Sequence, residues 1–166
     1  MTFGGAERQV VHLAGQLLQR GWEVEVVSLL EPDALTDHLA EAGVAYRTLA
    51  MPKGVPDPRG VWRLARCIRQ MRPDVVHAHM VHANLVTRVT RLLARMPVLI
   101  CSAHSVFEGG KRFDLAYRLT DGLCELTTHV SQAAVDRWIR GGVAPARKMR
   151  VMPNGVDVAQ FGGGAE

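Results

Sequence analysis

Residues 74–101 have the sequence DVVHAHMVHANLVTRVTRLLARMPVLIC, which predicts a strand, a helix and a second strand in immediate succession. Its first part is apolar and β-branched, its middle repeats apolar residues at helical spacing, and Pro97 introduces a second apolar run. Two strands joined by a helix can pair in parallel but cannot form a hairpin. This stretch therefore predicts a βαβ unit within a parallel sheet.

The flanking sequence continues this alternation in both directions. Helices are expected at 6–20, 33–42, 58–72 and 112–123 and after Ser131, and further strands at 23–30, 44–49, 126–130 and 149–152. Such a pattern predicts an α/β fold, a Rossmann-like doubly wound parallel sheet with helices on both faces. Ligands of such sheets bind beyond the carboxyl ends of the strands, here near residues 1–7, 79–84, 103–111 and 130–132.

Length and composition describe one domain with an ordinary core. The chain has 166 residues, of which 48% are hydrophobic and 22% charged, and this balance excludes disorder. It has no apolar run of membrane-spanning length and no signal-peptide pattern, so we expect it in the cytoplasm. Cys67, Cys101 and Cys124 are far apart and odd in number, which favours buried, inert thiols.

Six short segments, taken in order, resemble family 4 glycosyltransferases of the GT-B fold. They are GGAER at 4–8, LQRGWEV at 18–24, PDVVHAH at 73–79, SAHS at 102–105, VS at 130–131 and VMPNGVD at 151–157. The resemblance implies an acceptor-side, N-terminal domain over residues 1–157. Residues 158–166 would be a truncated interdomain segment or tail, and a C-terminal donor-binding domain would have to act as partner.

The chain departs from the family at its beginning. Family members have a strand before the Gly-Gly-Ala-Glu segment, in the middle of the sheet, whereas only Met1-Thr2-Phe3 stands here. Strands at 24–29 and 75–77 would then face an unfilled position with unpaired backbone groups. We therefore expect low stability for this chain in isolation.

The resemblance implies a transferase that moves a sugar from a nucleotide-sugar donor to a glycan or lipid-linked acceptor. The reaction would be retaining and metal-independent, with no cofactor besides the donor substrate, and this chain alone would be inactive. The alternative is a non-catalytic acceptor-binding module or an inactive remnant that needs a separate donor-binding half. A generic nucleotide-binding Rossmann protein is a third possibility, which the missing first strand disfavours.

The helix that begins near Gly4 and Gly5 is a candidate for the donor-phosphate and acceptor loop. Its first N–H groups are exposed and its dipole favours an anion, while glycines let a ligand approach the backbone. By resemblance Glu7 belongs to the same loop. The alternative is a tight turn required only for packing.

Histidines supply the other candidate site residues. His104 follows a buried strand and by resemblance lines the sugar site, where it would assist catalysis; the alternative is a loop histidine bonded to backbone. His79, His82, Asn84 and Ser131 are expected to border the acceptor cleft. No metal site is predicted, because no carboxylate or thiol completes a ligand set around these histidines.

Basic residues give the chain a net charge of +4. One predicted helix contains Trp62 and four arginines, Arg59, Arg63, Arg66 and Arg69. This helix could contact anionic lipids at the inner face of the cell membrane. The alternative is an ordinary solvated helix face. Nucleic-acid binding is not expected, because stacking aromatics do not alternate with the basic residues.

Overall fold

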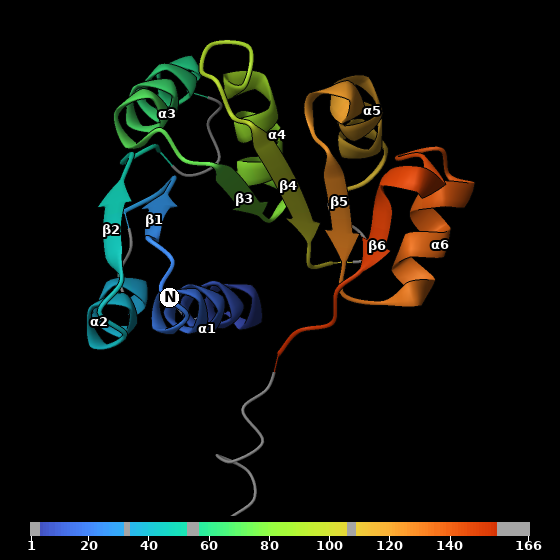
Figure 1. Ribbon diagram of the computed structural model, residues 1–166. Helices are drawn as coiled ribbons and strands as arrows, with labels where there is room; N and C mark the ends of the chain where they lie inside the picture. Colours follow the sequence, from blue (N-terminus) through green and yellow to red (C-terminus); the bar gives the residue numbers. More distant parts are fainter. Residues whose placement is uncertain (1–3, 32–33, 53–56, 106–108, 156–166) are drawn as a thin grey trace, which may run out of the picture.

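A computed structural model describes residues 4–31, 34–52, 57–105 and 109–155 (Figure 1). Its helices are α1 (Gly5–Gln19), α2 (Ala34–Glu41), α3 (Pro58–Met71), α4 (Val81–Thr90), α5 (Lys111–Thr120) and α6 (Gln132–Arg140). Its strands are β1 (Glu25–Ser28), β2 (Ala45–Thr48), β3 (Val75–His79), β4 (Val98–Ala103), β5 (Leu126–His129) and β6 (Met149–Val151). Short 3₁₀ turns lie at Asp121–Leu123 and Ala146–Lys148.

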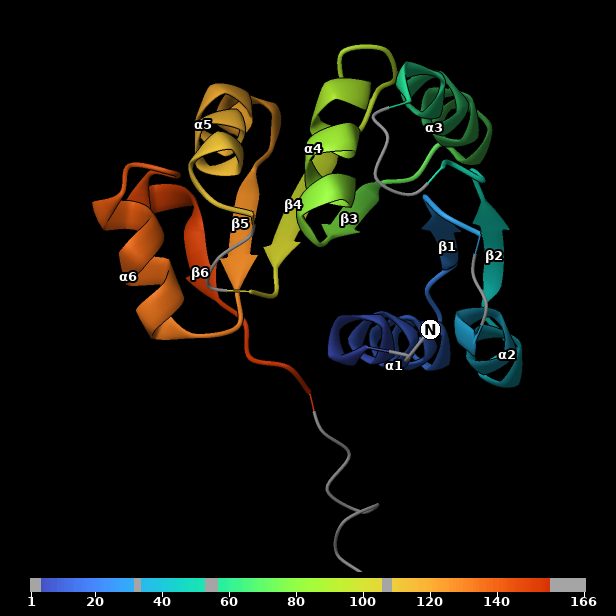
Figure 2. The same cartoon turned by 180° about the vertical axis from the view of Figure 1, so that it is seen from behind.

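The strands form two parallel sheets. β1 pairs with β2, and β3, β4, β5 and β6 form a four-stranded sheet in that order. In both views the strands cross the molecule in the order β2, β1, β3, β4, β5, β6 (Figures 1 and 2). The prediction of a parallel α/β fold is confirmed.

The position between β1 and β3 remains unpaired in the part of the chain that is described. Among the described residues β1 is bonded only to β2 and β3 only to β4, and Val75 on β3 is 42% exposed. The expected gap between the strands at 24–29 and 75–77 is therefore present. Each sheet has an open parallel edge on this side.

Helix α3 joins the two sheets instead. Its buried residues Leu64, Ala65 and Ile68 lie in one apolar cluster with Leu49, from the end of β2, and Leu99 of β4. The guanidinium of Arg63 donates to the carbonyl of Leu49 at 2.7 Å, and that of Arg69 donates to the carbonyl of Leu93 at 2.6 Å. Side-chain packing and two arginines thus replace strand pairing as the connection.

Capping residues set the helix boundaries where the sequence predicts them. The Asp57 carboxylate accepts from the N–H of Arg59 at 2.9 Å, with Pro58 at the first helical position of α3. The Ser131 hydroxyl accepts from the N–H of Ala134 at the start of α6. Among the described residues, every helix is too short or too polar to cross a bilayer.

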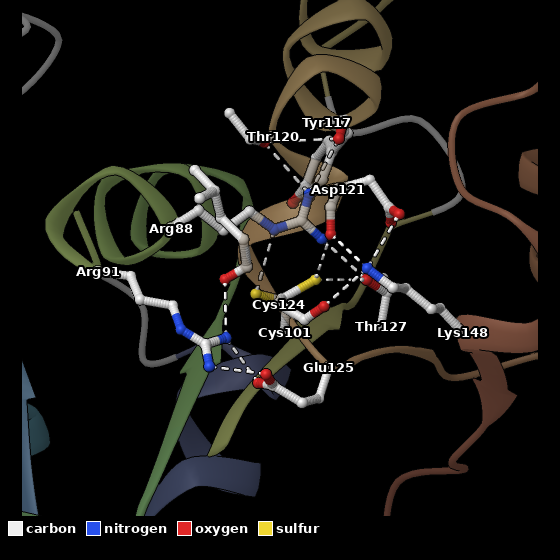
Figure 3. A network of polar contacts seen from close by, with 11 residues as sticks. Arg88, Arg91, Cys101, Tyr117, Thr120, Asp121, Cys124, Glu125, Thr127 and Lys148 are labelled. Carbon is white, nitrogen blue, oxygen red and sulfur yellow. Dashed lines mark hydrogen bonds and ion pairs between the residues drawn. The ribbon is translucent and has the colours of Figure 1, made fainter. Parts of the chain in front are cut away.

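A buried arginine organises the interior beneath the four-stranded sheet (Figure 3). Arg88 of α4 is 1% exposed and donates to the hydroxyl of Thr127 at 2.8 Å and the carbonyl of Tyr117 at 3.0 Å. Its Nε lies 3.4 Å from the sulfur of Cys101. One side chain thereby links α4, β4, α5 and β5, and α4 lies across β3 and β4 in the view from behind (Figure 2).

The cysteines are free thiols, and two of the three are buried as expected. A hydrogen bond with Cys124 and burial raise the pKa of Cys101. The same hydrogen bond and the nearby Arg88 charge lower the pKa of Cys124, against the effect of burial. Cys67 is only partly buried.

Candidate functional site

The two faces of the four-stranded sheet differ in polarity. Leu99, Cys101 and Ala103 of β4 point to the face covered by α3 to α6, where they join the apolar clusters. Side chains alternate along a strand, so the neighbouring Ser102 points to the other face, in register with His79 and Thr128. This polar face lies opposite α1.

A cavity of about 330 Å³ separates α1 from the polar face. Its wall includes Gln9, His12, Leu13, Gln16 and Arg20 from α1, His77, His79, Ser102, Ala103 and Thr128 from the sheet, and His104, Val130 and residues 152–155. A second cavity of about 530 Å³ lies at the helix starts, lined by Gly5, Ala6, Met80, Val81, His104, Ser105, Gly109 and Asn154. His104 lines both cavities.

Three histidines are in contact where these cavities meet. Nδ1 of His79 lies 3.1 Å from Nε2 of His104, so one nitrogen donates the hydrogen bond and the other accepts it. The rings of His77 and His79 are 4.1 Å apart between centroids. Nε2 of His77 lies 2.7 Å from the hydroxyl of Ser102, which in turn is 2.6 Å from that of Thr128. The hydroxyl of Ser102 thus contacts the histidine cluster at His77, and the hydroxyl of Thr128 contacts that of Ser102.

Burial keeps these imidazoles neutral near pH 7. Burial, with a smaller contribution from His104, lowers the pKa of His77 to about 4. Burial and the neighbouring His77 and His104 lower the pKa of His79 to about 3. The pKa of His104 is also lowered, by burial and then by His129. A neutral imidazole can both donate to and accept from a sugar hydroxyl.

His129 fixes the segment next to His104. Its Nδ1 accepts from the N–H of Val130 at 2.9 Å, so the proton is on Nε2, which lies 3.2 Å from the carbonyl of Ser105 and donates to it. The ring also packs edge-on against Trp138. His129 thereby connects the loop after β4 to the core.

The start of α1 provides close backbone access. A methyl group added at Gly5 would meet nothing within 4 Å, so a ligand can approach this backbone. The Glu7 carboxylate accepts from the N–H of Gly4, and the N–H groups of the following first turn have no intrahelical acceptors because they begin the helix. An anion at this helix start would gain those N–H groups but would approach the charge of Glu7.

The structure brings some of the predicted site residues together and separates others. Gly5 and His104 line the same cavity, and His79 is hydrogen-bonded to His104. His82 is exposed with its ring against Phe113, and Ser131 caps α6.

Asn84 is fully buried and contacts the core. Its amide donates to the carbonyl of Ser102 and to the hydroxyl of Tyr117. That geometry gives Asn84 a supporting position behind the histidine cluster. Among the described residues, no group of three or more histidine, cysteine or acidic side chains is arranged to hold a metal ion.

The sequence profile of Glycosyltransferase Family 4 matches residues 3–160 of the chain. The chain belongs to this family. No curated protein matches it significantly. The family 4 match covers all of the strands and helices described above, including the two cavities and the histidine cluster.

Two solved structures are similar to the chain in fold. One is Anabaena Alr3699/HepE in complex with UDP and glucose, with a TM-score of 0.73 and 20% identity over 96% of this chain and 43% of that protein. The other is a glycosyltransferase from Rickettsia africae ESF-5, with a TM-score of 0.79 and 17% identity over 97% of this chain and 42% of that protein. The chain therefore spans less than half the length of either structure.

Sequence reasoning missed several residues that build the site. Ser102 and Thr128 support His77, and the side-chain amide of Gln9 bonds to both backbone groups of Gly155, at 2.6 and 2.8 Å. Serine and threonine inside buried strands were a usable signal, because a buried hydroxyl needs a partner. The sequence offered no comparable signal for the contact of Gln9.

Proposed function

We propose that this family 4 chain forms the acceptor-side wall of a glycosyltransferase active site. The enzyme would transfer a sugar from a nucleotide-sugar to a hydroxyl of a glycan or lipid-linked acceptor. The observation that carries the proposal is that Gly5 and His104 line one cavity at the carboxyl ends of the strands. Ligands of parallel α/β sheets bind at this end.

In this proposal His104 assists at the sugar site as a neutral hydrogen-bonding group. Its lowered pKa and its bond to His79 support that role, because a neutral, oriented imidazole can bind a hydroxyl or stabilise charge that develops there. The backbone at Gly4 and Gly5, with Glu7 beside it, would lie next to the donor diphosphate. His79, His82 and Ser131 would lie on the acceptor side.

A retaining, metal-independent reaction is part of the same proposal, with the nucleotide-sugar as donor and no further cofactor. A second, donor-binding domain would supply the groups that stabilise the leaving diphosphate. The chain covers 43% of Alr3699/HepE, which was solved with UDP and glucose, and this supports a requirement for such a domain. Without it, the chain would serve as an acceptor-binding module.

The decisive experiment is His104→Ala in a polypeptide that joins this chain to its donor-binding domain. We expect kcat to fall about 10- to 100-fold, the cost of removing one group that assists in the transition state. His38→Ala, on an exposed helix, is the matched control and should leave turnover unchanged. Turnover of His104→Ala at the control level would remove His104 from the proposed site.

We also propose a peripheral contact of α3 with anionic membranes. Arg59, Trp62 and Arg66 are exposed on one side of this helix, and Trp62 is 62% exposed. Arg63 and Arg69 already bond to backbone carbonyls, so their charges are partly committed to the fold. Cosedimentation with vesicles rich in anionic lipid tests the contact. Binding at low salt that is lost in Arg59→Gln/Arg66→Gln supports it, and no binding at low salt refutes it.

A further inference from the structure

Met80 has a backbone conformation that non-glycine residues rarely adopt. Its φ is 71° and its ψ is 156°, a region that is almost exclusive to glycine and is strained for other residues. Arg72 also has a positive φ, but at 49° and 52° it has the ordinary left-handed conformation of a helix C-cap. Met80 is therefore the more strained of the two.

The strain arises because Met80 alone connects β3 to α4. Its N–H donates to the carbonyl of Ser102 at 3.0 Å and so extends the pairing of β3 with β4. Its carbonyl accepts from the N–H of Asn84 at 2.9 Å, which is the first hydrogen bond of α4. One residue makes both the last hydrogen bond of the sheet and the first of the helix, and it does so with a positive φ.

A glycine would make the same connection without strain, yet the chain has a methionine here. The Met80 side chain is 40% exposed and contributes little to the core. It lines the 530 Å³ cavity together with Ala6 and Val81, in the same wall as His104 and Asn154. The strained turn thus places a flexible apolar residue in the wall of a cavity that also has polar groups.

We propose that Met80 is a specificity-determining residue for the acceptor, selecting molecules that have an apolar group attached to the receiving sugar. This rests on the proposed function and narrows its acceptor class. Polar lining groups such as His104 would contact the sugar, and Met80, Ala6 and Val81 would contact the apolar group. Methionine suits this position because its flexible thioether adapts to irregular apolar partners.

The test compares two probes, octyl β-D-glucopyranoside below its critical micelle concentration and methyl β-D-glucopyranoside. We expect the 166-residue chain to bind the octyl glycoside more tightly and to show a shift of the Met80 methyl resonance. Met80→Gly should weaken binding of the octyl glycoside about tenfold, as expected for losing part of one apolar side chain. Met80→Leu should restore most of that affinity, and the methyl glycoside should not distinguish these variants.

Thermal unfolding supplies a second measurement. Met80→Gly should raise Tm by about 2–4 °C, because relief of strain exceeds the added chain entropy. Arg72→Gly is the matched control: it removes another positive-φ side chain, which is exposed and is not part of the cavity wall, and should leave glycoside binding unchanged. A rise in Tm together with weaker octyl binding is the expected signature.

Three results would overturn the role of Met80. They are equal affinity for both glycosides, wild-type octyl affinity in Met80→Gly, or no binding of the octyl glycoside. One result would reject the role of Met80 and still support the proposed sugar site. In it, the chain binds the octyl and the methyl glucoside with equal affinity, and His104→Ala abolishes binding of both. Loss of the sugar site is judged separately, by turnover of His104→Ala in the joined enzyme.

Discussion

The four-stranded region and the β1–β2 region are built differently although both are parallel α/β structure. In the four-stranded region a buried polar network around Arg88 lies between the sheet and helices α4 and α5, and an ion pair of Lys148 with Asp121 at 3.2 Å extends it (Figure 3). The β1–β2 region has a small cluster around Ala14, Leu39 and Val44, and in its Arg47–Glu25 ion pair Arg47 is exposed and Glu25 is partly buried.

The alternation of strands and helices continues across both regions, although the described strands lie in two separate sheets. Parallel strands are normally stabilised by pairing on both sides. In the part of the chain that the structure describes, β1 and β3 are each paired on one side, and α3 packing connects the regions. We therefore expect the β3–β6 region to be the more stable part of the chain.

Among the changes that we predict, substitution of Arg88 should lower the stability of the chain the most. Arg88→Met removes the guanidinium that donates to the carbonyl of Tyr117 and the hydroxyl of Thr127 in the core, so we expect a loss of about 2–4 kcal/mol in the free energy of unfolding. Urea denaturation measures it. Arg66→Met, on the exposed face of α3, is the control and should change stability by less than about 0.5 kcal/mol. If Arg88→Met and Arg66→Met are equally stable, the polar network around Arg88 does not contribute to the stability of this region.

Acid should destabilise the folded chain through the histidine cluster, and this is the second-largest effect that we expect. His77 and His79 have folded-state pKa values of about 4 and about 3, below the unfolded value of 6.5, so the unfolded chain binds more protons at pH 4–6.5. Their contribution to stability is complete above pH 6.5 and is lost as pH falls towards 4, by about 2–3 kcal/mol for each histidine.

Denaturation midpoints from pH 7 to pH 4 test this dependence. His79→Gln should flatten the profile, whereas His38→Gln, on the exposed side of α2, should keep the wild-type slope. A profile of His79→Gln as steep as that of the wild type would assign the acid sensitivity to other groups.

Amide hydrogen exchange should show directly that the β1–β2 region is less stable than the β3–β6 region. We expect amides of β1 and β2 to open with a free energy about 2 kcal/mol below that of β4, because β4 is paired on both sides and β1 on one. Uniform protection across both sheets would mean that they unfold as one unit and that α3 packing suffices to couple them.

The smallest expected effect concerns the contact between α1 and the segment after β6. Gln9→Ala removes two hydrogen bonds to the backbone of Gly155 at an exposed position, so we expect a loss of about 0.5–1 kcal/mol. Gln19→Ala, which loses only a surface contact with Gln16, should cost less. Equal effects would show that the α1 contact adds no stability.

Much of the fold could be predicted from short-range signals. The Asp57-Pro58 cap, the Ser131 cap and the glycines that follow α1 and α2 place the helix ends within a few residues. These signals act within one turn of chain, so a single sequence contains them. His104 could be placed at the ligand end of the sheet for the same reason, since it follows a recognisable strand.

The sequence by itself determined the order of elements, the parallel sheet and the end of the sheet where the candidate site lies, because periodicity and capping are local properties. The tertiary structure alone decided which side chains meet. His79 and His104 are 25 residues apart, Gln9 and Gly155 are 146 apart, and Arg88 reaches Thr127 across 39 residues. Such contacts depend on strand register and helix docking, which no local pattern specifies. The strain at Met80 has the same origin, because it exists only once β3 is paired and α4 has begun.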